Sequence, residues 1–143
     1  MKKIDCFKDE YFFLSNFYEV PVEYDGLKYG SSEAAYQAQK CEFPSKRKEF
    51  QNLSPSKSKS LGKKVTLRED WDEVKYKVML EIVRNKFKQN SELKEKLIAT
   101  GDTYLEEGNW WGDIIWGVCN GVGKNILGKI LMKVRDELKN KQL

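Results

Sequence analysis

Residues 18–40 read YEVPVEYDGLKYGSSEAAYQAQK, and the spacing of the apolar side chains changes once along this stretch. Apolar and polar residues alternate over residues 18–29 on both sides of Asp25-Gly26, a dipeptide typical of tight hairpin turns. Pro21 favours a sheet edge for this hairpin, because proline cannot donate a ladder hydrogen bond. Residues 33–40 are good helix formers preceded by two serines that can cap a helix. The stretch therefore predicts a β-hairpin that leads into a helix.

The same two periods predict the other elements. Short strands are expected at residues 4–7 and 11–14, followed by a polar loop at residues 15–17. The remaining expected elements are two short helices within residues 44–64, helices from Asp70 to near Asn90, from Ser91 to Gly101 and from Asn125 onward, a strand at residues 104–106 and a glycine-punctuated loop at residues 108–123. Strands first and helices after predict an α+β fold, a mainly helical single domain of residues 1–143 with a small antiparallel sheet.

The composition is typical of one compact domain. Of the 143 residues, 40% are hydrophobic and 13% aromatic, which is enough to build a core without disulfides or metal. No apolar run approaches the ~18 residues that cross a bilayer, and the amino terminus lacks the apolar stretch of a signal peptide. We therefore expect a cytoplasmic protein that does not associate with membranes.

The chain contains no histidine, which excludes Ser-His-Asp and Cys-His mechanisms and every histidine-ligated metal site. Acid and base chemistry is left to carboxylates, lysines and tyrosines. Cys6, Cys41 and Cys119 are an odd number without a C-x-x-C pair, so they predict neither a zinc site nor a disulfide framework. We expect no metal and no cofactor.

Positive charge is concentrated in residues 44–64. This basic segment holds seven cations against one anion, Glu49, which leaves +6; since the whole chain carries +4, the rest carries −2. Such a patch attracts phosphates of a nucleotide or of a nucleic-acid backbone. A solvated loop in a lysine-rich protein is an equally simple interpretation, and both stay open.

The predicted helix at residues 33–40 carries four unlike polar groups on one stripe. Glu33, Tyr36, Gln37 and Lys40 stand at positions i, i+3, i+4 and i+7, so a carboxylate, a phenol, an amide and an amine share a face. A solvent-facing side with Glu33 favoured by the helix dipole would explain them. A ligand site is the alternative, because an exposed face seldom needs tyrosine and glutamine between its charges.

Three tryptophans lie close together in residues 106–117, EEGNWWGDIIWG. A glycine-rich stretch of this kind offers flat apolar walls and a few polar contacts to a planar ligand, although tryptophans are also common in cores. Asp113 lies between the tryptophans, where burial would change its acidity.

Residues 121–125, GVGKN, resemble a phosphate-binding loop only in part. The first glycine and the final Ser or Thr of that motif are missing, as is the third glycine of a dinucleotide-binding loop. We expect an ordinary glycine loop before the last helix, although the free N–H groups of that helix could bind an anion.

These motifs, taken in order, resemble the NADAR family, also called YbiA-like. The matching segments run through nearly the whole chain, at residues 13–18, 25–29, 32–40, 61–62, 67–71, 78–79, 100–102, 109–117, 123–128 and 131–132. The resemblance implies a YbiA-like fold and an N-glycosidase that separates a ribose phosphate from a base or amine.

Members of the family look like one of two kinds of enzyme. Some resemble ADP-ribosyl hydrolases that release ADP-ribose from modified guanine in nucleic acid, and others act on phosphoribosylamino-pyrimidines of the riboflavin pathway. The second kind commonly has histidine after the motif glutamate, where this chain has Ala34, so the first is favoured. A module that binds ADP-ribose or NAD without cleaving it, and a purely structural or nucleic-acid-binding protein, are further alternatives.

The same resemblance implies the roles of individual residues. Catalysis is expected from Glu33, Lys40 and Asp113, and substrate contacts are expected from Asn16, Tyr36, Gln37, Arg68, Trp71, Trp110, Trp116 and Asn125. Burial and nearby cations should lower the pKa of Lys40, and its amine should be able to form an imine with a ring-opened ribose. The expected partners are an ADP-ribose or phosphoribosyl N-glycoside and, through residues 44–64, ADP-ribosylated nucleic acid.

Overall fold

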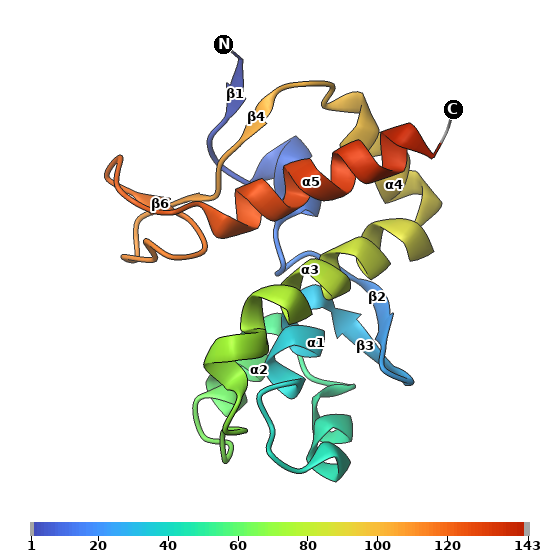
Figure 1. Ribbon diagram of the computed structural model, residues 1–143, viewed down its shortest axis with the longest axis vertical. Coiled ribbons are helices and arrows are strands. Elements are labelled where there is room, and N and C mark those ends of the chain that lie inside the picture. The colour runs from blue at the N-terminus through green and yellow to red at the C-terminus, as the bar shows by residue number, and fades with distance from the viewer. Residues whose placement is uncertain (1, 142–143) are drawn as a thin grey trace. The chain divides into compact units, whose positions relative to one another are not determined.

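The computed structural model describes residues 2–141 (Figure 1). They form two compact units, one of residues 16–89 and one of residues 2–15 with 90–141. The elements are β1 (Lys3–Ile4), the 3-10 helix η1 (Asp9–Leu14), β2 (Glu19–Tyr24), β3 (Leu27–Ser31), α1 (Ser32–Ala38), the 3-10 helix η2 (Pro44–Phe50), α2 (Pro55–Gly62), α3 (Trp71–Gln89), α4 (Ser91–Ala99), β4 (Tyr104–Leu105), β5 (Gly108–Asn109), β6 (Val118–Cys119) and α5 (Ile126–Asn140). The predicted α+β class, mainly helical with short strands, is confirmed.

The predicted hairpin opens the unit of residues 16–89. β2 and β3 pair antiparallel, with Tyr24 opposite Leu27 across the turn. Asp25 and Gly26 both adopt positive φ, 50° and 85°, which is the backbone that a two-residue hairpin turn requires. The register shifts between Glu19 and Val22, where Pro21 cannot donate to the ladder.

Helix α1 begins where it was predicted, and it lies at the centre of its unit. The Ser31 hydroxyl accepts a hydrogen bond from the Ala34 N–H at 3.1 Å and caps the helix. The hairpin, η2, α2 and α3 all pack against it, so every residue of the helix is buried. Its surroundings are those of a core helix.

The basic segment forms η2 and α2, so the two short helices expected there are confirmed. Six of its seven cations are exposed, and only Arg47 is largely buried. The long helix α3 follows and buries an apolar face that includes Val78, Ile82 and Phe87. It ends one residue before the expected Asn90.

In the other unit, β1 pairs parallel with β4, and β5 pairs parallel with β6. Among the strand pairs within residues 2–141, only β2 and β3 run antiparallel, so the expectation of one small antiparallel sheet is incomplete. α4 ends before Gly101, whose φ is +65°, and α5 buries the predicted apolar face that includes Leu127, Leu131 and Val134. None of the helices within residues 2–141 is long and apolar enough to span a bilayer.

The strand predicted at residues 11–14 is wrong, because these residues belong to η1. Phe13 and Leu14 are buried side by side, whereas a strand would direct consecutive side chains to opposite faces. A four-residue apolar run does not distinguish a strand from a helical turn by its period. Packing decided between them.

Candidate active site

The polar stripe of α1 is buried, which overturns its interpretation as a solvent-facing side. Glu33, Tyr36 and Gln37 are 8%, 6% and 5% exposed. Lys40 lies just beyond the helix and is half-buried. A carboxylate, a phenol and an amide that share one buried stripe with an amine at its end are suited to chemistry rather than to solubility.

Gln37 holds the Glu33 carboxylate in place. Its Nε2 donates a hydrogen bond to Glu33 Oε2 at 2.6 Å, one helical turn away. Its amide oxygen is buried against Gly62 of α2 and accepts no hydrogen bond from the described residues. A Cβ at position 62 would collide with that oxygen, so Gly62 lets α2 approach α1 closely enough to fix the amide.

Asn16 anchors the start of α1. Its backbone carbonyl accepts a hydrogen bond from the Glu33 N–H at 3.1 Å, and its Oδ1 accepts one from the Ser32 hydroxyl at 2.9 Å. Its Nδ2 lies 3.5 Å from the Met79 sulfur of α3. Asn16 is 8% exposed, and these bonds make it a residue that positions Glu33.

Tyr36 connects the amine end of the stripe to α3. Its ring centroid lies 5.1 Å from that of Trp71 at an angle of 54°, and the Lys40 Nζ lies 6.0 Å from the same tyrosine ring. Trp71 therefore supplies an aromatic wall beside the stripe, within the same unit.

Lys40 is the amine that the sequence indicated. Burial lowers its pKa, and the nearby ammonium groups of Lys63, Lys59 and Lys75 lower it further, while the Glu33 carboxylate raises it. The lowering prevails, as predicted. Among the described residues its Nζ has no hydrogen-bond or ion-pair partner, so it is available to a ligand.

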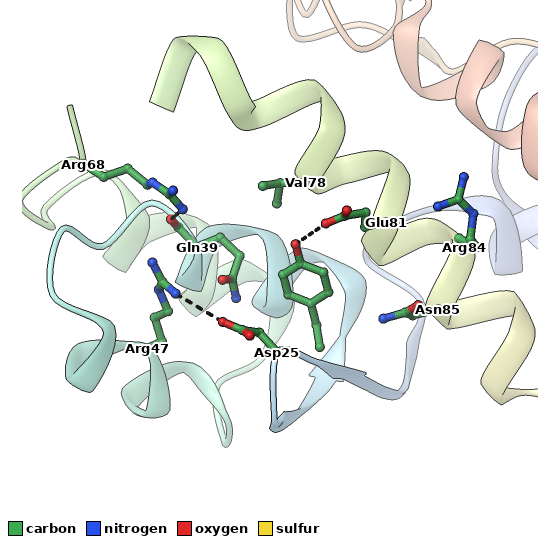
Figure 2. A pocket seen from close by; sticks show the side chains of 9 residues that line it. Asp25, Gln39, Arg47, Arg68, Val78, Glu81, Arg84 and Asn85 are labelled. Carbon is green, nitrogen blue, oxygen red and sulfur yellow. Dashed lines mark hydrogen bonds and ion pairs between the residues drawn. The ribbon is translucent and has the colours of Figure 1, made fainter. Parts of the chain in front are cut away.

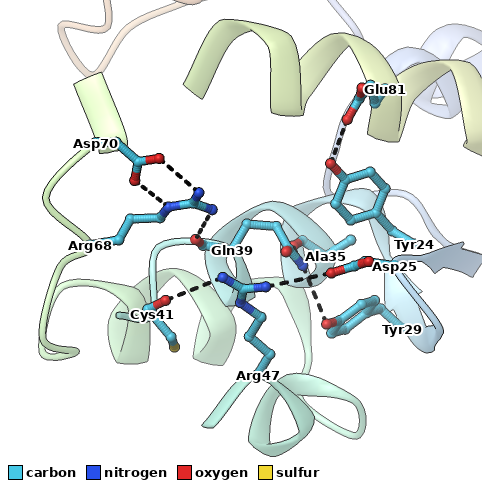
Figure 3. A network of polar contacts seen from close by, with 10 residues as sticks. All are labelled: Tyr24, Asp25, Tyr29, Ala35, Gln39, Cys41, Arg47, Arg68, Asp70 and Glu81. Atoms are coloured by element: carbon cyan, nitrogen blue, oxygen red, sulfur yellow. Dashed lines mark hydrogen bonds and ion pairs between the residues drawn. The ribbon is translucent and has the colours of Figure 1, made fainter. Parts of the chain in front are cut away.

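Arg68 lies in a different environment from the stripe. It lines a polar pocket with Val78 and Glu81 of α3 (Figure 2). Its Nε and one terminal nitrogen donate to the two Asp70 oxygens at 2.6 and 3.0 Å, and its other terminal nitrogen reaches the Gln39 carbonyl at 3.5 Å (Figure 3). Both oxygens of Asp70, the residue that precedes α3, are thus engaged by Arg68.

Residues 106–117, the tryptophan loop, belong to the unit that contains α5. Trp110 and Trp111 are 86% and 53% exposed, so the alternative that they are core residues is wrong. Trp116 is half-buried. The Asn109 side chain closes the turn by accepting from the Asp113 N–H at 3.0 Å and donating to its carbonyl at 2.8 Å.

Asp113 closes the next turn of this loop. Its Oδ1 accepts hydrogen bonds from the backbone N–H groups of Ile115 and Trp116, at 3.1 and 2.9 Å. Its Oδ2 accepts none from the described residues, and the residue is half-buried. One oxygen therefore fixes the loop and the other remains open to a ligand.

The N–H groups that lead into α5, and those of its first two residues, are occupied. The four backbone N–H groups of residues 124–127 donate to carbonyl oxygens of residues 114–117, at 2.8 to 3.3 Å. An anion would have to displace these bonds, so the glycine loop before α5 is the ordinary connection that was expected. The same bonds attach the tryptophan loop to the helix.

Asn125 joins this helix to β4. It is 2% exposed and adopts a positive φ of 52°. Its Nδ2 donates to the Tyr104 hydroxyl and the Leu105 carbonyl, at 3.2 and 2.9 Å, and its Oδ1 accepts from the Glu107 N–H at 3.0 Å. The side-chain amide of Asn125, which was expected to contact substrate, is thus engaged within the fold.

The expected site residues divide between the two units. Asn16, Glu33, Tyr36, Gln37, Lys40 and Trp71 come together around α1, whereas Trp110, Asp113, Trp116 and Asn125 belong to the loop and start of α5. Gly62 and Ser32 support the site without having been predicted as site residues. Only the Leu61-Gly62 pair of the family pattern pointed to Gly62, because the need for a small residue at a helix contact becomes visible only once the contact is known.

The fold and this stripe define a class of protein, an α+β enzyme that presents a buried carboxylate and an oriented amide on one helix and an amine of lowered pKa just beyond its end. Within residues 2–141 no group of three cysteine or acidic side chains is placed to hold a metal ion. The chain belongs to the NADAR family, whose domain model matches residues 5–139. That match runs through both compact units.

Known relatives resemble the chain over most of its length. N-glycosidase YbiA of Shigella boydii is 38% identical over 134 residues, which cover 91% of this chain and 83% of that protein. Riboflavin biosynthesis protein VVA0006 of Vibrio vulnificus is 40% identical over 130 residues, 88% of this chain but only 35% of that protein. The NMR structure of Escherichia coli YbiA matches with a TM-score of 0.88 at 35% identity, over 99% of this chain and 87% of that one. The predicted family, the YbiA-like fold and the enzyme class, a hydrolase of the N-glycosidase type, are confirmed.

Proposed function

We propose that this chain releases ADP-ribose from ADP-ribosylated guanine in nucleic acid, and that its two units make one NADAR domain. The observation that carries the proposal is the buried stripe of α1, where Gln37 orients the Glu33 carboxylate and the Lys40 amine has a lowered pKa. A buried carboxylate is what cleavage at the anomeric carbon of a ribose needs, and a neutral amine can react with the ribose aldehyde that cleavage releases.

The reaction breaks the bond between the ribose C1 and a nitrogen of the base. The bonding electron pair and a proton go to that nitrogen, while a water oxygen bonds to C1 and gives up a proton. The sugar ring carries positive charge in the transition state. A buried carboxylate stabilises that charge more strongly than one in water, and it can also accept the proton of the water. Glu33 is assigned this role.

Asp113 and Lys40 are assigned the remaining steps. The open Oδ2 of Asp113 is suited to protonating the leaving nitrogen or to binding a ribose hydroxyl, since its Oδ1 is held by the loop backbone. The Lys40 amine can add to the aldehyde of ring-opened ribose, with loss of water, to form an imine. Tyr36 and Trp71 offer flat apolar contact beside it.

Two observations favour nucleic acid as the carrier of the modified base. Six of the seven cations of residues 44–64 are exposed, so the segment presents a strongly positive surface to phosphates. Trp110 and Trp111 expose aromatic faces on which unpaired bases can stack. A small phosphoribosyl substrate would need neither.

A phosphoribosylamino-pyrimidine of riboflavin biosynthesis is the second candidate substrate. The 40% identity to a protein named for riboflavin biosynthesis favours it. Ala34 argues the other way, because it stands where the pyrimidine enzymes of the family commonly have histidine.

Incubation with three substrates tests these assignments. The protein should release ADP-ribose from an ADP-ribosylated guanine oligonucleotide, and it should leave NAD and a phosphoribosylamino-pyrimidine intact. Release of base from the pyrimidine alone would select the second candidate. Binding of ADP-ribose with no cleavage of any substrate would identify a binding module and refute the enzymatic proposal.

A further inference from the structure

The polar cavity that Arg68 lines lies in the unit of residues 16–89, and none of the four stripe residues (Glu33, Tyr36, Gln37 and Lys40) lines it. It measures about 560 Å³ and is bounded by the hairpin turn, the end of α1, η2 and α3 (Figure 2). Val78 is the only aliphatic residue among the nine that line it. A cavity of this size and polarity is suited to a small charged ligand rather than to an apolar one.

Two of the three arginines that line this cavity, Arg47 and Arg68, lie on the same side of it, away from Arg84 (Figure 2). Arg68 and Arg47 approach the end of α1 from different segments, with Gln39 between them (Figure 2). Arg68 bonds the Gln39 carbonyl, and a terminal nitrogen of Arg47 lies 3.5 Å from the Cys41 carbonyl (Figure 3). Both arginines thus donate to carbonyl groups that follow the end of α1, where a positive charge is favoured.

The two arginines differ in how well their charge is balanced. Arg68 forms a bidentate pair with Asp70, at 2.6 and 3.0 Å. Arg47 has a more distant partner: its terminal nitrogen lies 3.6 Å from Asp25, a carboxylate that is 71% exposed at the hairpin turn. The Arg47 side chain is only 13% exposed, and its buried Nε has no hydrogen-bond partner among the described residues.

A largely buried guanidinium with an unused N–H and a long contact to a surface acid is an incomplete anion site. The cavity's other acid, Glu81, already accepts a hydrogen bond from the Tyr24 hydroxyl at 2.6 Å. Asp25 is therefore the acid that a ligand can displace from the cavity, because it lies on the exposed hairpin turn and its ion pair with Arg47 is long, at 3.6 Å.

We propose that Arg47 and Arg68 form a binding site for a phosphate group in this cavity, and that the Asp25 carboxylate occupies part of it when no phosphate is bound. Phosphate offers several acceptor oxygens and matches the planar guanidinium fork better than a carboxylate held 3.6 Å away. The phosphate could belong to a free phosphate or monoester, or to a nucleic-acid diester. None of the residues assigned to catalysis lines the site, so phosphate binding can be tested apart from the N-glycosidase activity, although Arg68 was also expected to contact substrate.

Asp25→Asn provides a substitution that leaves the fold unchanged. Position 25 has a φ of 50°, which asparagine adopts as readily as aspartate, so the turn is kept while the competing charge is removed. We expect Asp25→Asn to bind inorganic phosphate about two- to fivefold more tightly than the parent protein, the range for loss of one exposed ion pair. Isothermal titration calorimetry at low salt measures it.

Arg47→Gln removes the guanidinium and should weaken phosphate binding by about tenfold or more, because charge-assisted hydrogen bonds are lost. The phosphate affinity of Arg47→Lys should lie between those of the parent protein and Arg47→Gln, since an ammonium keeps the charge without the planar guanidinium fork. Lys77→Gln, an exposed cation of α3 outside the cavity, is the matched control and should bind as the parent does. Circular dichroism of each variant without phosphate checks its fold.

A dinucleoside monophosphate, which carries one diester, distinguishes the two sources of phosphate. If it responds to Asp25→Asn and Arg47→Lys and inorganic phosphate does not, the site binds a nucleic-acid backbone; the reverse result identifies a free phosphate or monoester. The proposal is wrong if neither probe binds Asp25→Asn, or if a folded Arg47→Gln binds both as tightly as the parent.

Discussion

Replacing Glu33 by glutamine removes one charge from the buried stripe and nearly preserves its shape. The carboxylate accepts a hydrogen bond from Gln37 at 2.6 Å, and an amide oxygen at the same position can accept it too. The substitution also acts on Lys40. Because the Glu33 charge opposes the effect of burial on that amine, its loss should lower the pKa of Lys40 further.

The expected effect on stability is small because two contributions oppose each other. Exchanging a charge-assisted hydrogen bond for a neutral one costs about 1 kcal/mol. Glu33 is only 8% exposed, so loss of the desolvation cost of its charge returns a similar amount. The free energy of unfolding should change by less than about 1 kcal/mol, which corresponds to a Tm shift of no more than about 2–4 °C.

The expected effect on activity is large, since loss of a general base or of a stabilising charge lowers turnover by about 10²- to 10⁴-fold. Single-turnover release of base, followed by chromatography, measures the activity, and thermal denaturation measures the fold. Glu95→Gln, which alters an exposed glutamate of α4, is the control and should retain parental values of both. Near-parental turnover of Glu33→Gln would show that Glu33 serves only the packing of α1.

Three further predictions concern groups around the stripe and the basic segment. Borohydride should trap ADP-ribose on Lys40 as a reduced imine. This trapping should persist to lower pH than labelling of surface lysines, because the lowered pKa of Lys40 keeps more of its amine neutral. Adducts scattered over other lysines, or retained in Lys40→Arg, would contradict the prediction. Gly62→Ala should reduce turnover by displacing the Gln37 amide, whereas Gly30→Ala, which adds a Cβ in open space, should not, and equal rates would remove Gly62 from the site. Substituting glutamine for three exposed lysines of the basic segment (Lys57, Lys59 and Lys63) should flatten the salt dependence of oligonucleotide binding by about 2 in the log–log slope, and an unchanged slope would exclude the segment as a phosphate contact.

Local sequence patterns were enough to predict the elements whose cause is local. Asp25-Gly26 specified the hairpin turn because both residues tolerate positive φ, and the 3.6-residue spacing of apolar side chains located α3 and α5. The stripe on α1 was visible for the same reason, since helical geometry alone places residues i, i+3, i+4 and i+7 on one face. Residues 11–14 carried no comparable signal, because a short apolar run suits a strand and a helical turn equally well.

Packing between elements remote in the chain determines which of those faces is buried and what each polar group bonds. α2 and α3 bury the stripe on α1, and Gly62 permits that contact although nothing near it in the sequence indicates a site. Arg47 was one of seven equivalent cations in the sequence, and it became distinct when η2 directed it into a cavity beside Arg68, a residue 21 positions away. Hydrogen bonding and desolvation depend on distances between segments remote in the chain, and a periodic pattern, which records only the spacing within one element, holds no information about them.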